Sequence, residues 1–249
     1  MIKFFRKIRQ NLLMENKTRT YFKYAIGEII LVVVGILIAL WLNNLNSERQ
    51  RTIEEINSLK GLKKDFQADI IDFKLNIRAY KKISSSVDFV LKRLESSVVY
   101  NDSLDSYFSG TMRWPRSIIN QNSFDVLKSK GLDLISNNSL RNEILTFHGQ
   151  FYTAIKTWED QFNRDIYFDE IIKRFDKVEP WKYGKDHKFQ LGVMKPINYN
   201  ALKTDTLYLS LLRTMKRDAE QLLYFHYATI IKDLESLVLN IDKELAILE

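Results

Sequence analysis

The sequence predicts an all-α protein, in which a single N-terminal transmembrane helix precedes an antiparallel bundle of long helices. Three observations support this fold class. Residues 24–42 form an apolar run with one charge. From Ile53 to Leu94, apolar residues then recur every three or four positions, which is the spacing of one helix face. The 249 residues include only eight glycines and three prolines, which favours long helices over a loop-rich β-sandwich.

The apolar run has the length and the flanks of a membrane-spanning helix. As a helix, residues 24–42 reach about 28 Å, close to the ~30 Å thickness of the hydrocarbon core. Tyr24 and Trp41 stand near its two ends, as aromatic residues do at membrane interfaces. A buried core helix is the alternative, but cores seldom need such a run. We therefore expect this helix to span the lipid bilayer.

The positive charge of the chain is concentrated before this run. The net charge is +7, and residues 1–23 carry +6 of it. A nucleic-acid-binding domain would spread basic residues over its folded body, so we expect no nucleic-acid partner. Lys and Arg accumulate on the cytoplasmic side of membrane helices. The N-terminus is therefore predicted in the cytoplasm, and residues 43–249 in the periplasm.

These charges predict a single-pass protein of the inner membrane in three parts. Residues 1–23 form a cytoplasmic basic amphipathic segment, residues 24–42 the transmembrane helix, and residues 43–249 an extracytoplasmic helical bundle. No small-x-small cleavage site follows the apolar run, so the run is predicted to be an uncleaved signal anchor.

The first residues have the pattern of a helix that lies on a membrane surface. Over residues 2–13, Phe and Leu side chains fall on one side of a helix and basic ones on the other. Such helices lie against anionic lipid headgroups. An ordinary charged flank without helical structure is the alternative. The predicted headgroup contacts are Lys3, Arg6, Lys7 and Arg9.

The rest of the chain is predicted as three long helices and one short helix. The stripe from Ile53 to Leu94 lacks proline, so the membrane helix is expected to continue outward as one rod, with Gly61 its only weak point. Residues 101–115 are polar and predict turns. A short helix over residues 123–130 is expected to stop at Gly131, where glycine tolerates the backbone of a helix cap.

The second long helix is expected to be capped by Asn138 or Ser139, to carry apolar residues as far as Phe175, and to end at residues 179–180. Residues 181–200 predict a loop or a small hairpin. The third long helix is expected to begin near Asp205 and to continue to the C-terminus.

Each of these helices is apolar on one face only. The helices must therefore bury their faces against one another or against another chain, and coiled-coil packing provides either solution. We expect a homo-oligomer or membership of a larger envelope complex.

Small residues in the apolar run suggest where two membrane helices approach each other. Gly35 and Ala39 are four residues apart, and Gly27 lies two further four-residue steps back. This spacing allows close packing of helices in membranes. The alternative is chance, because small residues are common in membrane helices.

Glu28 is the one charge in the apolar run. An acid inside a membrane helix suggests ion movement or pairing with a basic group of a partner. Glu28 lies only about one turn from the cytoplasmic end, where a carboxylate reaches interfacial water or Lys23. A structural or assembly role is therefore the stronger interpretation.

The sequence carries no recognisable catalytic or metal-binding motif. With no cysteine, it lacks disulfides, a thiol nucleophile and thiolate metal ligands. Its three histidines, at 148, 187 and 226, form no i,i+4 ligand pair. We expect no enzymatic activity, no catalytic residue, no cofactor and no metal.

Other polar and aromatic residues have a structural interpretation that is stronger than the functional one. Acids on the second long helix are expected on its solvated face; these are Glu159, Asp160, Asp165, Asp169 and Glu170. Several aromatic residues are expected in core packing rather than in a ligand pocket; these are Trp114, Trp158, Trp181, Tyr224 and Tyr227.

Two segments resemble a family of uncharacterised single-pass membrane proteins of the Bacteroidetes. The first is MIKFFRKIR at residues 1–9 with YAIGEIILVVVGILIA at residues 24–39. The second is SFDVLKSKGLDLISNNSLRN at residues 123–142. Together they cover about a fifth of the chain. The resemblance implies the single-pass topology and transfers no activity.

Three functions remain open at this point. The first is a non-enzymatic scaffold or accessory subunit of a cell-envelope complex, acting through helix-mediated assembly. The second is a periplasmic ligand-binding sensor module, which would need a separate cytoplasmic partner because only 23 residues precede the span. The third is an ion-coupled membrane element that uses Glu28, which normal function of a Glu28→Gln variant would exclude.

Overall fold

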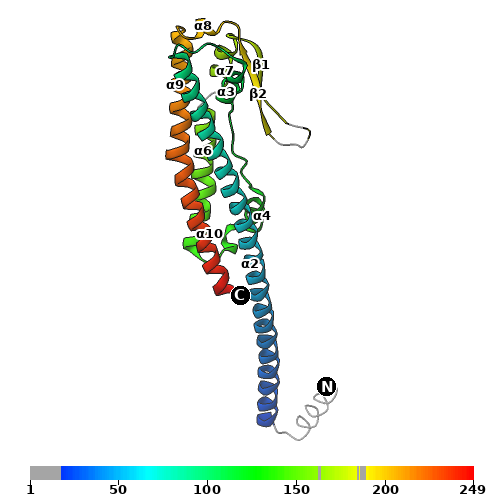
Figure 1. Ribbon diagram of the computed structural model, residues 1–249. Coiled ribbons are helices and arrows are strands. Elements are labelled where there is room, and N and C mark those ends of the chain that lie inside the picture. The colour runs from blue at the N-terminus through cyan, green and yellow to red at the C-terminus, as the bar shows by residue number, and fades with distance from the viewer. Residues whose placement is uncertain (1–17, 162–163, 184, 186–188) are drawn as a thin grey trace. The chain divides into compact units, whose positions relative to one another are not determined.

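The computed structural model describes residues 18–161, 164–183, 185 and 189–249 (Figure 1). The chain divides into two compact units, Met1–Glu54 and Glu55–Glu249. Helix α2 (Thr18–Leu94) contributes residues to both, and Gly61 does not interrupt it. The absence of proline and the regular spacing of apolar residues explain this length of 77 residues.

The second unit is an antiparallel bundle, and together with α2 it confirms the predicted all-α class (Figure 1). Residues 55–94 of α2 form the first helical run of the bundle. They pack against a second run, residues 138–161, and against a third run, residues 206–248. Polar pairs between the first and third runs show the opposite chain directions: Lys63–Asp242, Lys74–Glu235 and Lys216–Asp88.

The core of the bundle is aromatic at its centre. Phe73 of α2 is fully buried and meets the rings of Tyr152 and Tyr227 edge-on, at centroid distances of 6.4 and 5.5 Å. Tyr80, seven residues further along α2, has its ring centroid 5.8 Å from that of Tyr227. The stripe predicted from the sequence is therefore the face that α2 buries in this unit.

The turns predicted over residues 101–115 are partly wrong, because this segment contains a helix. A 3-10 turn η1 (Asp102–Leu104) leads into α3 (Asp105–Thr111). Leu104, Phe108 and Met112 are four residues apart and buried, so this short segment has an apolar face of its own. Gly110 allows the close approach to α2, since a Cβ there would lie 2.5 Å from the Ser86 Oγ.

The predicted short helix is confirmed as α4 (Asn122–Lys130), and it ends where expected. Gly131 has a φ of +103°, a conformation that side-chain-bearing residues rarely adopt. The 3-10 turn η2 (Leu132–Leu134) follows.

The second long helix differs from the prediction at both ends. It comprises α5 (Asn138–Thr146), the π-helical η3 (Phe147–Phe151) and α6 (Tyr152–Gln161), and α7 (Arg164–Ile172) follows. Its N-cap is Asn137, not Asn138 or Ser139, because the Asn137 side chain accepts hydrogen bonds from two backbone amides of the first turn.

The helical run stops before Phe175, where the sequence predicted that it continues. Strands β1 (Phe175–Tyr183) and β2 (Phe189–Pro196) form an antiparallel hairpin, with a register irregularity between Phe175 and Lys177. The hairpin alternative was therefore right, but the hairpin begins before residue 181. Phe175 is buried between Phe108 and Tyr208, so tertiary packing overrides the helical spacing here.

The third helical run begins as predicted. After the short α8 (Tyr199–Leu202), the Asp205 side chain accepts a 2.9 Å hydrogen bond from the Tyr208 amide and caps α9 (Thr206–Gln221). A π-helical segment, η4 (Leu222–Tyr227), joins α9 to α10 (Ala228–Leu248). Neither π-helical segment is predictable from apolar spacing alone.

Candidate functional site

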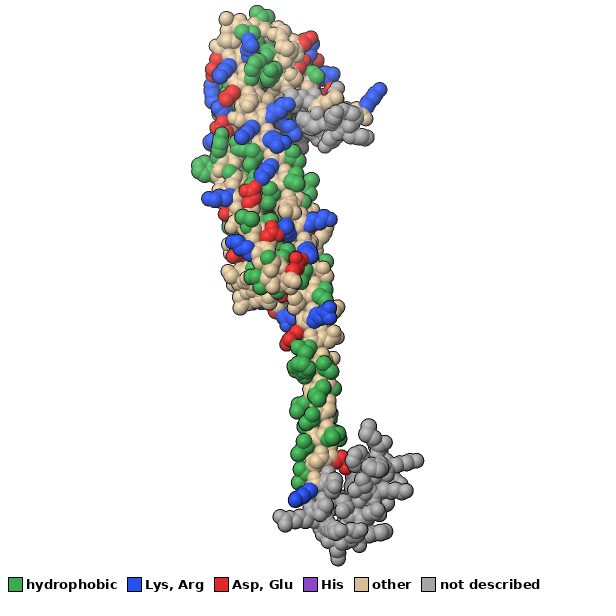
Figure 2. Space-filling model, turned by 60° about the horizontal axis from the view of Figure 1, so that its bottom comes forward, with side chains coloured by type: hydrophobic (Ala, Val, Ile, Leu, Met, Phe, Trp, Pro, Cys, Tyr) green, Lys and Arg blue, Asp and Glu red, His purple; other side chains and the backbone are tan. Residues whose placement is uncertain are grey.

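The first candidate site is the apolar part of α2 in the Met1–Glu54 unit. Among the described residues, α2 is the one helix long and apolar enough to cross a membrane, with a mean hydropathy of 2.7 over its best 18 residues. None of that window is buried, and apolar side chains cover its visible face (Figure 2). Such a surface requires a cover of lipid or of other apolar side chains.

The small residues of this segment leave room for close contact. A Cβ added at Gly27 or Gly35 would meet no atom within 4 Å. Ala39 is exposed, and Glu28 is partly exposed one position after Gly27. The headgroup contacts predicted at Lys3, Arg6, Lys7 and Arg9 lie outside the described residues.

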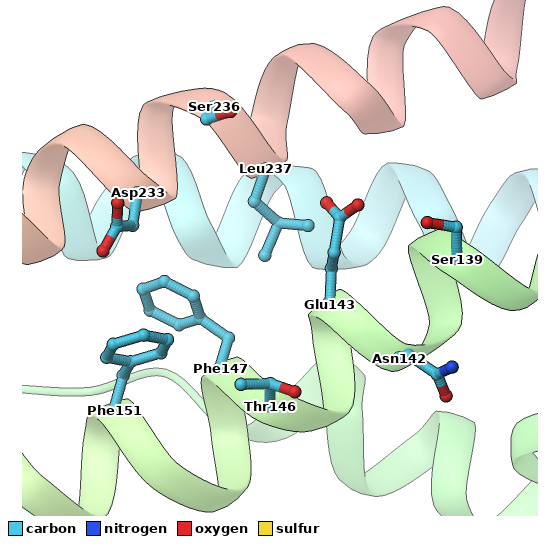
Figure 3. A pocket seen from close by; sticks show the side chains of 9 residues that line it. All are labelled: Ser139, Asn142, Glu143, Thr146, Phe147, Phe151, Asp233, Ser236 and Leu237. Atoms are coloured by element: carbon cyan, nitrogen blue, oxygen red, sulfur yellow. The ribbon is translucent and has the colours of Figure 1, made fainter.

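The second candidate site is a groove of about 400 Å³ in the Glu55–Glu249 unit, between α5 and η3 on one side and α10 on the other (Figure 3). Nine residues line it: Ser139, Asn142, Glu143, Thr146, Phe147, Phe151, Asp233, Ser236 and Leu237. None of these nine was predicted as a site residue from the sequence, because they come from two helical runs about 90 positions apart.

Aromatic rings form part of the groove. Phe147 and Phe151, the first and last residues of η3, have ring centroids 5.1 Å apart. Phe147 is buried, and Phe151 is partly exposed. A π-helical turn is wider than an α-helical one and often occurs at functional sites.

Carboxylates stand on both walls of the groove. Glu143 of α5 accepts a 2.9 Å hydrogen bond from the Asn240 Nδ2 of α10, which ties the two helices together. Asp233 of α10 is partly exposed and has no hydrogen bond or ion pair among the described residues. The lining includes no Lys or Arg, so the groove is acidic.

A separate set of carboxylates holds the segment between α3 and α4. Residues 113–121, which we call the strap, have no regular secondary structure. Their amides donate to acids on the helices: Ile118 N to Asp72 Oδ2 and Asn120 N to Asp69 Oδ1, both at 3.0 Å. Burial raises the pKa of Asp69 and of Asp72, against the opposing effect of these hydrogen bonds.

Glu159 belongs to this set, which corrects its predicted place on a solvated face. It is 3% exposed and accepts hydrogen bonds from Ser117, at 2.9 Å from the amide, and from the Tyr227 hydroxyl. Asp160 and Asp169 are exposed as predicted, and Glu170 is partly exposed. The side chain of Asp165 lies outside the described set.

The signal for the strap acids is present in the sequence. Asp65, Asp69 and Asp72 are spaced by four and three, so they share one face of α2 beside its apolar stripe. Asp65 completes the row by accepting a 2.9 Å hydrogen bond from the Ser123 amide. Sequence reasoning missed their role because the segment they hold has no pattern of its own.

His148 is buried without a hydrogen-bond partner on either ring nitrogen. Its ring stacks on Phe124 of α4 at 3.8 Å and lies 5.4 Å from Phe66 of α2. Burial lowers the pKa of His148 to about 4. The ring is therefore neutral at pH 7 and packs as an aromatic residue.

The predicted core aromatics are divided between core and surface. Tyr227 is buried, and Trp114 and Trp158 pack against the core. Tyr224 is 66% exposed, so its predicted place in the core is wrong. The π-helical turn η4 places Tyr224 and Phe225 outward together. The side chain of Trp181 is outside the described residues.

The described residues contain no group of three or more His, Cys, Asp or Glu side chains placed to hold a metal ion. Two buried acids outside the strap instead accept hydrogen bonds from the segment before α5: Glu55 from Ser136 and Glu244 from Asn137.

These features define a class: an all-α protein with one helix apolar enough to cross a membrane and a helical bundle. Residues 28–167 match the model of DUF6090, a family of unknown function. This match covers more than half of the chain, so the protein belongs to that family. It includes most of the apolar run and the whole 123–142 segment. No curated protein and no solved structure matches the chain.

Proposed function

We propose that this protein is a non-enzymatic scaffold or accessory subunit of a cell-envelope complex, anchored in the inner membrane by residues 24–42. The N-terminus is cytoplasmic in this proposal, and the bundle is periplasmic. The single-pass topology and an origin in the Bacteroidetes, which the sequence resemblance implies, form part of the proposal.

The observation that carries the proposal is the apolar window of α2, none of which is buried. Exposure of a window with mean hydropathy of 2.7 to water is unfavourable, whereas its transfer into the hydrocarbon core of a bilayer is favourable. The seven basic residues before the run support the cytoplasmic position of the N-terminus. Open space beside Gly35 supports contact with a second membrane helix.

The test is extraction of the native protein in a mild detergent, followed by measurement of complex mass and subunit composition. We expect a stable assembly, either of several copies or with other envelope proteins. Gly35→Ile with Ala39→Ile should weaken it, because bulk on this face prevents close approach. The matched control is Val33→Ile with Leu37→Ile. These substitutions change the side chains on the opposite side of the same helix, about 180° from Gly35 and Ala39.

A monomeric wild-type protein would overturn the scaffold proposal. Equal disruption by both double variants would instead show that assembly does not use the Gly35 face. Retention of the complex in both would place the contacts in the bundle, where Tyr224 and Phe225 are exposed.

A second candidate, a ligand-binding sensor module, is favoured by the groove between α5 and α10. Its volume is in the lower part of the range typical of small-molecule sites. This candidate includes a separate cytoplasmic partner that would carry the signal.

A further inference from the structure

The groove between α5, η3 and α10 has a charge and a surface that together select one chemical class of ligand. We propose that it binds an organic ammonium ion, with the charged nitrogen at Asp233 and its alkyl groups against the partly exposed Phe151. This inference does not depend on the scaffold proposal, because it concerns only the Glu55–Glu249 unit.

The position of Asp233 supplies the first argument. Its carboxylate is directed toward the end of the groove that holds the two phenylalanine rings (Figure 3). Asp233 has no hydrogen bond or ion pair among the described residues, unlike Glu143, which is bonded to Asn240. A cation in the groove would give this carboxylate a partner.

The partly exposed ring of Phe151 supplies the second argument, independent of the charges. An aromatic face attracts a cation within about 6 Å of its centroid, and this is the usual recognition of quaternary ammonium groups. Phe151 also provides apolar contact for alkyl substituents, whereas Phe147 and Leu237, each 3% exposed, contribute little surface. A hard metal ion needs six or more oxygen ligands, which an aromatic surface does not offer.

The wall composition excludes anions. No Lys or Arg lines the groove, and Glu143 adds a second negative charge on the opposite wall. An anionic ligand would meet two carboxylates in a partly enclosed space without a compensating cation. Ser139, Asn142 and Ser236 provide hydroxyl and amide groups for a polar substituent on the ligand.

The test uses the full chain in an uncharged maltoside detergent, with choline as the probe and saturation-transfer NMR on its methyl protons. The matched probe is 3,3-dimethylbutan-1-ol, which has the shape of choline without its charge. We expect choline to receive saturation from the protein and the alcohol to receive several-fold less. Empty micelles control for partition into detergent.

Variants assign the signal to the groove. Asp233→Asn should weaken choline binding about three- to fivefold, as expected for a partly exposed charge pair. Phe151→Leu should weaken it by a similar factor, since leucine keeps the apolar contact and loses the ring face. The control is Glu235→Gln, an exposed acid on the same helix that pairs with Lys74 and lies outside the groove lining.

Three results would overturn the proposal: equal saturation of choline and the uncharged alcohol, no saturation of either, or unchanged choline binding by Asp233→Asn. Circular dichroism and melting temperature identify any variant that fails to fold. For such a variant, competition of wild-type choline binding by tetramethylammonium but not by acetate gives the decision instead.

Discussion

The two parts of α2 show how the same kinds of residue serve opposite purposes. Residues 25–42 are apolar at nearly every position, and their side chains are almost all exposed within the structure. Residues 55–94 are apolar at every third or fourth position, and those side chains are buried. A continuous apolar surface needs a solvent that is itself apolar, whereas a stripe needs only neighbouring helices. The arrangement of apolar residues, rather than their number, separates the two roles.

The largest expected effect tests the first part of this comparison. Val33→Arg with Leu37→Arg places two charges in the apolar run. These charges should raise the free energy of membrane insertion by roughly 5–7 kcal/mol. We expect the chain to be lost from the membrane fraction after alkaline carbonate extraction. The matched control is Asn46→Arg with Gln50→Arg, which has the same spacing outside the run and should remain in membranes. A wild-type chain in the soluble fraction would contradict the comparison.

The next effect tests the buried stripe. Phe73→Ala removes a fully buried ring that contacts Tyr152 and Tyr227, which should lower the free energy of unfolding by about 3–5 kcal/mol. Leu75→Ala is the control, because Leu75 lies two residues away and is 53% exposed. It should change stability by less than about 0.5 kcal/mol. Urea unfolding followed by tryptophan fluorescence measures both free energies of unfolding. Equal losses in the two variants would show that the buried and the exposed face of α2 contribute equally to stability, which would contradict the comparison.

The acids beside that stripe, such as Asp69, should contribute less to the free energy of unfolding than the Phe73 ring does. They should contribute more than an acid at the surface. Asp69→Ala deprives the Tyr152 hydroxyl, the Asn120 amide and the Asn120 side chain of their acceptor. Loss of these buried acceptor contacts should cost about 2–3 kcal/mol in the same unfolding experiment. Asp88→Ala is the control. Its ion pair with Lys216 is near the surface and should contribute below about 1 kcal/mol.

The smallest expected effect concerns His148, which packs against Phe66 of α2. Its pKa is about 4 in the folded protein because burial disfavours the charged ring, while nearby Asp65 and Asp125 oppose this shift. Between pH 6.5 and 4 the unfolded chain takes up a proton that the folded protein does not. Stability is therefore fully present above pH 6.5 and is lost as the pH falls toward 4.

The His148→Phe variant provides the comparison for that titration, because phenylalanine preserves the ring stack and has no proton to bind. The difference in free energy of unfolding between variant and wild type, measured at pH 7 and at pH 4.5, should increase on acidification. An unchanged difference would mean that His148 is accessible to protons in the folded state.

Much of the fold was predictable because it depends on local signals. The apolar run and the stripe after it predict α2, Gly131 predicts the end of α4, and Asp205 predicts the start of α9. Each of these signals acts through the backbone or the helix face of its own segment.

The errors arise where contacts between distant segments decide. Phe175 has the right spacing to extend a helix, but Phe108 and Tyr208 bury it in a strand. Glu159 has the pattern of a solvated acid, but the strap and Tyr227 cover it. Glu143 and Asp233 share a groove only because α5 and α10 pack together, which no spacing along the chain reveals.

The strap also constrains the order in which the bundle assembles. Ile118 and Asn120 direct their amides to side chains of α2 and not to neighbouring backbone, and Ser117 depends in the same way on Glu159 of α6. A segment of this kind has no structure to form early, because its acceptors exist only once the helices that carry them have come together. We therefore expect the link between α3 and α4 to become ordered late in folding, after the helices that supply its acceptors.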